Sequence, residues 1–110
     1  MADLADAARN LILAINSTDL QRIQDSSRDF VEQVTFGTAE EILTTLREVL
    51  SDDWMGLPPW ARNLAYRLAC LQRPHDAALL REAAADLLCF GPDWDDVAED
   101  LQQRAARLET

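Results

Sequence analysis

TAEEILTTLREVL, residues 38–50, is the segment that most directly sets the fold. Thr38 followed three positions later by Glu41 matches the capping box, in which the two residues satisfy each other's free backbone N–H groups at a helix start. The apolar positions that follow recur at intervals of three and four, which places them on one face of a helix. They are Ile42, Leu43, Leu46, Val49 and Leu50. The segment is therefore predicted to be a helix with one buried side.

Five further segments show helical spacing of apolar residues, and each is bounded by a start or a stop signal. Their predicted ranges are 3–16, 17–36, 59–72, 76–90 and 93–108. Ser17 or Thr18 is expected to cap the second helix, and Gly37 is expected to end it in the left-handed conformation. Pro59 suits the first turn of the fourth helix, and Asp76 can cap the fifth.

The predicted fold is all-α: a single helical domain over residues 1–110, built as a compact bundle of five to six mostly antiparallel helices. Short connections between the segments favour antiparallel neighbours. The composition agrees, because 48% of the residues are apolar and only three are glycine and four proline. The fifth helix has the widest apolar face and is expected near the centre of the bundle.

The charge of the chain excludes several classes of partner. Twenty acidic residues stand against ten arginines, so the formal net charge is −10. Nucleic-acid phosphates and anionic lipids are repelled by such a surface, so neither a nucleic acid nor a membrane is an expected partner. No apolar run reaches the roughly 18 residues that span a bilayer. Asp3 and Asp6 stand where a signal peptide needs basic residues. We therefore expect a cytoplasmic protein, and the exclusive use of arginine over lysine is typical of GC-rich bacterial genomes.

The sequence carries no recognisable catalytic or metal site, and no cofactor is predicted. His75 is the only histidine, and Cys70 and Cys89 are expected to be reduced, buried thiols. The carboxylates at Asp52–Asp53 and around Asp93 flank predicted helix ends, where they are explained as caps and dipole partners. The chain is therefore not expected to be an enzyme.

An aromatic segment is the predicted partner-binding site. Two tryptophans, a methionine and a leucine crowd a proline-stiffened stretch of seven residues, and a third tryptophan follows the fifth helix. These residues are Trp54, Met55, Leu57, Trp60 and Trp94. An apolar cluster rimmed by acids is the type of surface that protein partners use. The alternative is that the segment folds back as a lid over the bundle and buries its rings.

Three functions remain open at this point. The first is a non-enzymatic protein-interaction or regulatory module with a protein partner of unknown identity, and a homodimer is also compatible. The second is an antitoxin or immunity-type inhibitor whose acidic helices bind a basic partner protein, because residues 1–55 carry four arginines and eleven acids, a net of −7. The third is an enzyme or small-molecule binder, which would need a deep enclosed pocket with convergent polar groups.

Overall fold

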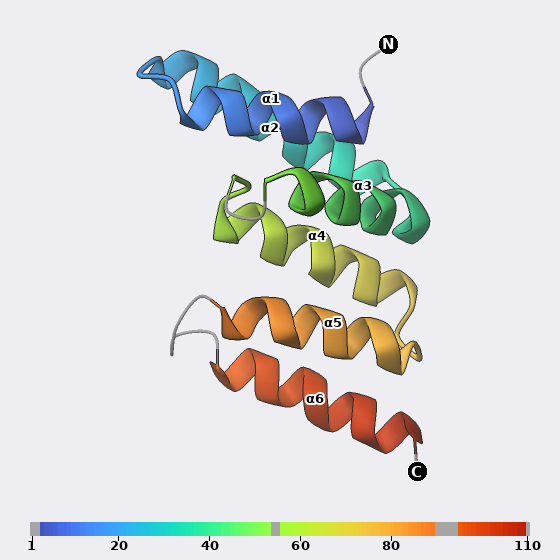
Figure 1. Cartoon of the computed structure of the whole chain (residues 1–110). Coiled ribbons are helices and arrows are strands. Elements are labelled where there is room, and N and C mark those ends of the chain that lie inside the picture. Colours follow the sequence, from blue (N-terminus) through green and yellow to red (C-terminus); the bar gives the residue numbers. More distant parts are fainter. Residues whose placement is uncertain (1–2, 54–55, 90–94, 110) are drawn as a thin grey trace.

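A computed structural model describes residues 3–53, 56–89 and 95–109. These residues form six helices and no strand (Figure 1). The helices are α1 (Leu4–Ile15), α2 (Leu20–Phe36), α3 (Ala39–Asp52), α4 (Pro59–Gln72), α5 (Ala77–Leu88) and α6 (Asp95–Glu109). The predicted all-α bundle is confirmed. None of the helices in these ranges combines the length and the apolar character needed to cross a lipid bilayer.

Helix starts follow the capping rules, with one shift. The Thr38 hydroxyl accepts the N–H of Glu41 at 3.1 Å, and the Asp76 carboxylate accepts the N–H of Leu79 at 3.0 Å, as predicted. Asp19, not Ser17 or Thr18, caps α2. The hydroxyl of Ser17 instead donates to the carbonyl of Ala14 at 2.6 Å, so it belongs to the end of α1. Asp19 directly precedes the first residue of α2, and its carboxylate accepts the N–H of Arg22 at 3.2 Å.

Gly37 does not adopt the predicted left-handed conformation. Its φ of −76° and ψ of 155° are extended. An extended residue carries the chain directly into Thr38, whose own extended backbone is that of a helix cap. The side chain of Gln72 fixes this corner, since its amide donates to the Gly37 carbonyl at 2.9 Å and accepts the Ala39 N–H at 2.7 Å. The connection between α2 and α3 is thus held by the last turn of α4.

The helices are stacked in layers, from the α1–α2 pair through α3, α4 and α5 to α6 (Figure 1). The principal extents are 48 × 31 × 21 Å. α4 packs on α2, α3 and α5, whereas α5 packs mainly on α4 and α6. The prediction that the fifth helix lies at the centre was therefore wrong. Its wide apolar face is divided between two neighbours, α4 on one side and α6 on the other.

The apolar core runs through all the layers. Phe30, Ile42, Leu46 and other large side chains of α1 to α3 are fully buried, together with Leu57 before α4. In the α5–α6 hairpin the buried apolar residues are leucines and alanines in equal number, for example Leu80 and Ala83. Two charged side chains, Arg62 of α4 and Asp86 of α5, are buried between the two parts. The junction of α4 and α5 is therefore polar where the rest of the core is apolar.

Candidate binding groove

The predicted aromatic site is only partly accessible to a partner. Leu57 is 2% exposed and belongs to the core, where apolar side chains of several helices enclose it. The prediction that Leu57 contributes to a binding surface was therefore wrong. Trp60 is the second residue of α4 and is 41% exposed. Its ring packs edge-to-face on Phe30 of α2, with centroids 6.0 Å apart and planes at 84°. Trp54, Met55 and Trp94 lie outside the described residues.

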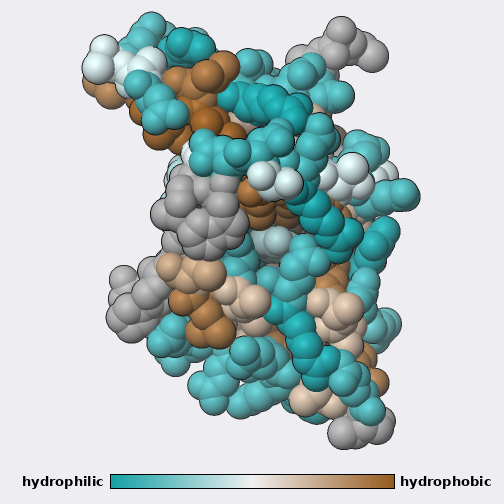
Figure 2. Space-filling view, in the orientation of Figure 1, coloured by the Kyte–Doolittle hydropathy of each residue, from teal (hydrophilic) through white to brown (hydrophobic). Residues whose placement is uncertain are grey.

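A small apolar area lies at the end of the molecule where α1 leads into α2. Figure 2 shows it in brown at the upper left. The exposed apolar side chains at this end are Leu13, Ile15 and Leu20. Gly56 lies close by, because a Cβ added there would be 3.2 Å from Cγ2 of Ile12. Leu13 also lines a wide, open hollow of about 230 Å³ together with Ile12 and Val49.

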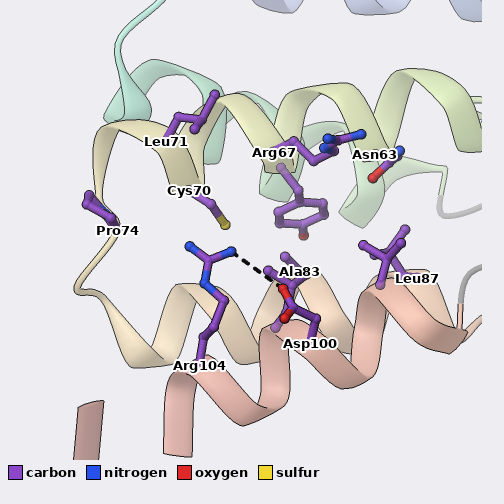
Figure 3. A pocket seen from close by; sticks show the side chains of 12 residues that line it. Asn63, Arg67, Cys70, Leu71, Pro74, Ala83, Leu87, Asp100 and Arg104 are labelled. Carbon is purple, nitrogen blue, oxygen red and sulfur yellow. Dashed lines mark ion pairs between the residues drawn. The ribbon is translucent and has the colours of Figure 1, made fainter. Parts of the chain in front are cut away.

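A better-formed hollow lies between α4, α5 and α6 (Figure 3). Its volume is about 170 Å³. Ala83 and Leu87 of α5 line it together with one face of α4 and one face of α6. Leu71 of α4 and Val97 of α6 line it too, with exposed fractions of 75% and 39%. We refer to this hollow as the α4–α6 groove.

The groove is not evident from the sequence, because the face of α4 that is most deeply buried is not its leucine face. The spacing of apolar residues along α4 predicts an apolar face that consists of Trp60, Leu64, Leu68 and Leu71. In the structure Ala61, Ala65 and Ala69 are fully buried, while Leu64 and Leu68 are only partly buried and Leu71 is exposed. Alanines allow neighbouring helices to approach closely, and this close approach turns Leu71 outward. Asn63, the short polar residue of α4 that lines the groove, belongs to no recognisable sequence motif.

Charged side chains from both helices reach the α4–α6 groove. Arg67 comes from α4 and Arg104 from α6, and both line the hollow (Figure 3). Arg104 lies 3.9 Å from the carboxylate of Asp100, one turn earlier on α6, which is a long and partly exposed ion pair. Arg67 forms no ion pair with any residue of the described ranges. The groove therefore offers guanidinium groups with much of their hydrogen-bonding capacity unused.

Two further polar groups face the groove from α4. The Oδ1 atom of Asn63 is shielded from solvent, yet it accepts no hydrogen bond from the described part of the chain. Burial raises the pKa of the Cys70 thiol, an effect that the charge of Arg104 partly offsets. The thiol is thus kept protonated and is a poor nucleophile. Cys89 is exposed, so only one of the two thiols predicted to be buried is so.

The layer behind the groove joins α4 to α5 through polar contacts. The guanidinium of Arg62 pairs with the Asp86 carboxylate, and both side chains are almost fully buried. Burial raises the pKa of Asp86 above its ordinary value, although the charge of Arg62 acts in the opposite direction. Glu82 of α5 accepts the Tyr66 hydroxyl at 3.0 Å and pairs with Arg47 of α3 at 2.8 Å. One carboxylate therefore connects three helices.

A second hollow has the opposite charge. It lies between the start of α1 and α3 and has a volume of about 710 Å³. Four carboxylates line it, those of Asp3, Glu40, Glu41 and Glu48, and no basic residue within the described ranges does so. Glu48 is partly neutralised by Arg9 of α1 at 2.9 Å. We refer to this wide, open hollow as the acidic groove.

The described residues hold no cluster of three or more histidine, cysteine or carboxylate side chains arranged for a metal ion. His75 is exposed in the α4–α5 turn. No family model matches the sequence, and no curated protein or solved structure is significantly similar to it. The fold and the site therefore define the class of the molecule only as an all-α helical bundle whose surface hollows include two of opposite charge.

Proposed function

We propose that the chain is a non-enzymatic protein-interaction or regulatory module, and that the α4–α6 groove is where its partner binds. The observation that carries this proposal is the combination of an apolar lining with two exposed apolar residues, Leu71 and Val97, at a hollow that also contains arginines. Exposed apolar residues around a hollow of this kind favour a protein surface as ligand. Arginine is enriched at such interfaces because its planar group pairs with carboxylates in two-point contacts.

The size of the groove favours one side chain of a protein over a separate small molecule. Pockets for drug-sized ligands measure roughly 300–1,000 Å³. The α4–α6 groove, at about 170 Å³, is smaller than this range. A hollow of that size suits a single anchor residue, the feature around which binding energy concentrates in protein interfaces. The raised pKa of Cys70 also argues against a nucleophilic role for the thiol beside it.

Capture of partners from native cells with two matched baits tests this proposal. Leu71→Asp places a charge at the groove, and Leu20→Asp places the same charge at a remote site on α2 of nearly equal exposure, 75% against 74%. Proteins retained by the wild type and by the Leu20 variant, and lost by the Leu71 variant, are the expected result. If all three baits retain the same proteins, the partner does not bind at the α4–α6 groove. Capture of no protein contradicts the interaction module itself.

The acidic groove favours a second candidate function, that of an antitoxin or immunity-type inhibitor of a basic protein. Four carboxylates, one at the N-cap of α1 and three on α3, form a surface that attracts a cationic partner over a distance. That association is expected to weaken steeply as ionic strength rises, since the Debye length falls from about 10 Å at 0.1 M salt to about 3 Å at 1 M. Replacing Glu40 and Glu41 by glutamine should also weaken binding of the basic partner. Unchanged binding would show that the acidic groove is not the binding site.

A cytoplasmic location remains part of this proposal. Cys70 and Cys89 are both free, which suits a reducing compartment. Fractionation of the native cell with an antibody against the chain tests the location. Recovery outside the cytoplasmic fraction would contradict it.

A further inference from the structure

We infer that the α4–α6 groove binds an acidic amphipathic helix, with one aromatic anchor residue in the hollow and carboxylates on the adjoining turns. The inference rests on the proposed function and adds the chemistry of the partner. It follows from three properties of the groove: the sign of its charge, its length and its free acceptor atom.

The charge at the groove is opposite to that of the whole chain. Arg67 and Arg104 line the hollow, and Arg104 also lines an adjoining hollow together with His75 and Arg107. Asp100 is the one carboxylate among the described residues that line either hollow. In a chain of net charge −10 this is a local reversal of sign. The local charge therefore favours carboxylates as the complementary groups of a partner.

The length of the groove matches a short helical segment. Its lining residues run from Asn63 to Leu71 on α4 and from Val97 to Arg104 on α6. Eight residues of helix rise about 12 Å, which is slightly more than two helical turns. A helix lying along the groove can present one apolar side chain to the floor and acidic side chains one turn before and after it. The exposed side chains of Leu71 and Val97 then pack against the apolar face of that helix.

The acceptor atom indicates the type of anchor. Oδ1 of Asn63 is buried and accepts no hydrogen bond from the described residues. A buried acceptor without a donor carries a free-energy cost that an incoming donor removes. Tyrosine and tryptophan combine a large apolar ring with one O–H or N–H donor, whereas leucine and phenylalanine do not. The anchor is therefore expected to be a tyrosine or a tryptophan, whose donor meets Oδ1 once the half-buried Asn63 side chain turns toward the hollow.

Two synthetic peptides of 14 residues test the inference. Both carry a fluorescein label, one central tyrosine and two leucines on the same helical face; the other face is glutamate-rich in one and lysine-rich in the other. Fluorescence anisotropy at about 0.15 M salt measures binding to the full chain, where screening limits long-range repulsion by the net charge. The acidic peptide is expected to bind more tightly than the basic one, and Leu71→Asp is expected to weaken that binding.

The decisive variant reverses the charge of the groove. Arg67→Glu combined with Arg104→Glu is expected to weaken binding of the acidic peptide roughly fivefold to thirtyfold, because two partly exposed ion pairs are lost. The matched control, Arg22→Glu combined with Arg28→Glu, makes the same change in charge on exposed positions of α2 and is expected to leave binding nearly unchanged. Equal loss in both double variants would show that net charge alone governs binding, which overturns the inference.

Three other results also overturn it. If only the lysine peptide binds and Leu71→Asp weakens this binding, the proposed function holds but the partner of the groove is basic. Binding of neither peptide removes the acidic helix, and the capture experiment then decides separately whether the groove binds a protein at all. A dimer in sedimentation equilibrium that Leu71→Asp dissociates assigns the groove to a second copy of the chain.

Discussion

The two sides of α4 differ in chemistry although they belong to one helix. Ala65 faces the apolar core that α1, α2 and α3 share. Arg62 and Tyr66 face α5, where they meet Asp86 and Glu82. The alanine side allows a neighbouring helix to approach closely, but small side chains do not select one relative position of the two helices. The polar side does so, because each polar group must lie opposite its own partner. We infer that the apolar side supplies most of the stability and that the polar side fixes the register of the α5–α6 hairpin.

Removal of one charge from the buried pair should have the largest effect. Arg62→Leu leaves the Asp86 carboxylate buried without its counter-ion, and breaking such a pair costs about 3–5 kcal/mol. The midpoint of urea unfolding at pH 7 is the measurement. Arg28→Leu, at an exposed position of α2, is the control. The double variant Arg62→Leu with Asp86→Leu is expected to regain most of the loss, because neither charge is then buried. A double variant no more stable than Arg62→Leu alone would contradict this account.

Overfilling the apolar side should have the next largest effect. Ala65→Leu adds three carbons where α4 meets the core, and overpacking of this kind costs about 1–3 kcal/mol. Ala106→Leu makes the same change at an exposed position of α6 and is expected to be nearly neutral. Thermal unfolding followed by circular dichroism compares the two. Equal stability of both variants would mean that close approach at Ala65 is unimportant.

Loss of the Tyr66 hydroxyl should have a smaller effect with a distinctive pH dependence. Tyr66→Phe removes one hydrogen bond to Glu82, and the expected cost near pH 7 is about 0.5–1.5 kcal/mol. Burial and the charge of Glu82 raise the pKa of Tyr66. Because the folded pKa is raised, this group's contribution is complete below the ordinary tyrosine pKa of about 10 and is lost as pH rises through the raised value.

Tyrosinate absorbance reports this ionisation without ambiguity, since the chain has a single tyrosine. The titration midpoint is expected well above that of free tyrosine. The stability of Tyr66→Phe should decline less in alkaline solution than that of the wild type. An ordinary midpoint for the folded chain would contradict burial of this side chain.

A charge at the groove should have the smallest effect on stability. Leu71→Asp changes an exposed side chain outside the core, so its unfolding free energy is expected to stay within about 0.5 kcal/mol of the wild type. Leu46→Asp, in the fully buried stripe of α3, provides the contrast and is expected to prevent folding. Strong destabilisation by Leu71→Asp would show that Leu71 contributes to packing. Loss of binding by this variant would then report unfolding and not a change at the groove.

Local features of the fold were predictable from the sequence, while contacts between helices were not. Thr38 and Asp76 were predicted as caps because a cap depends on a free N–H only three residues away. The buried stripe of α3 was predicted because its apolar residues are all large. On α4 the same rule failed, since alanines were buried and Leu71 was exposed. Side-chain size is a poor guide where a neighbouring helix approaches closely.

The candidate groove could not be predicted for a similar reason. Arg62 and Asp86 are 24 positions apart, and either alone resembles an ordinary charged residue on a helix surface. Arg67 and Arg104 come together only through the packing of α4, α5 and α6. Of the predicted aromatic site, Leu57 was wrong because it is enclosed by the core, Trp60 is half-exposed, and partner binding by the remaining residues stays a prediction.

The attachment of the α5–α6 hairpin has a consequence for the dynamics of the molecule. The hairpin joins the remaining helices chiefly through α4, and α6 packs mainly on α5. Sub-global opening at the α4–α5 junction would leave each half with its own apolar interior and would separate the two walls of the groove. A ligand that touches both walls binds only the closed arrangement, so it resists this opening by mass action. Occupancy and rigidity of the hairpin are therefore thermodynamically linked.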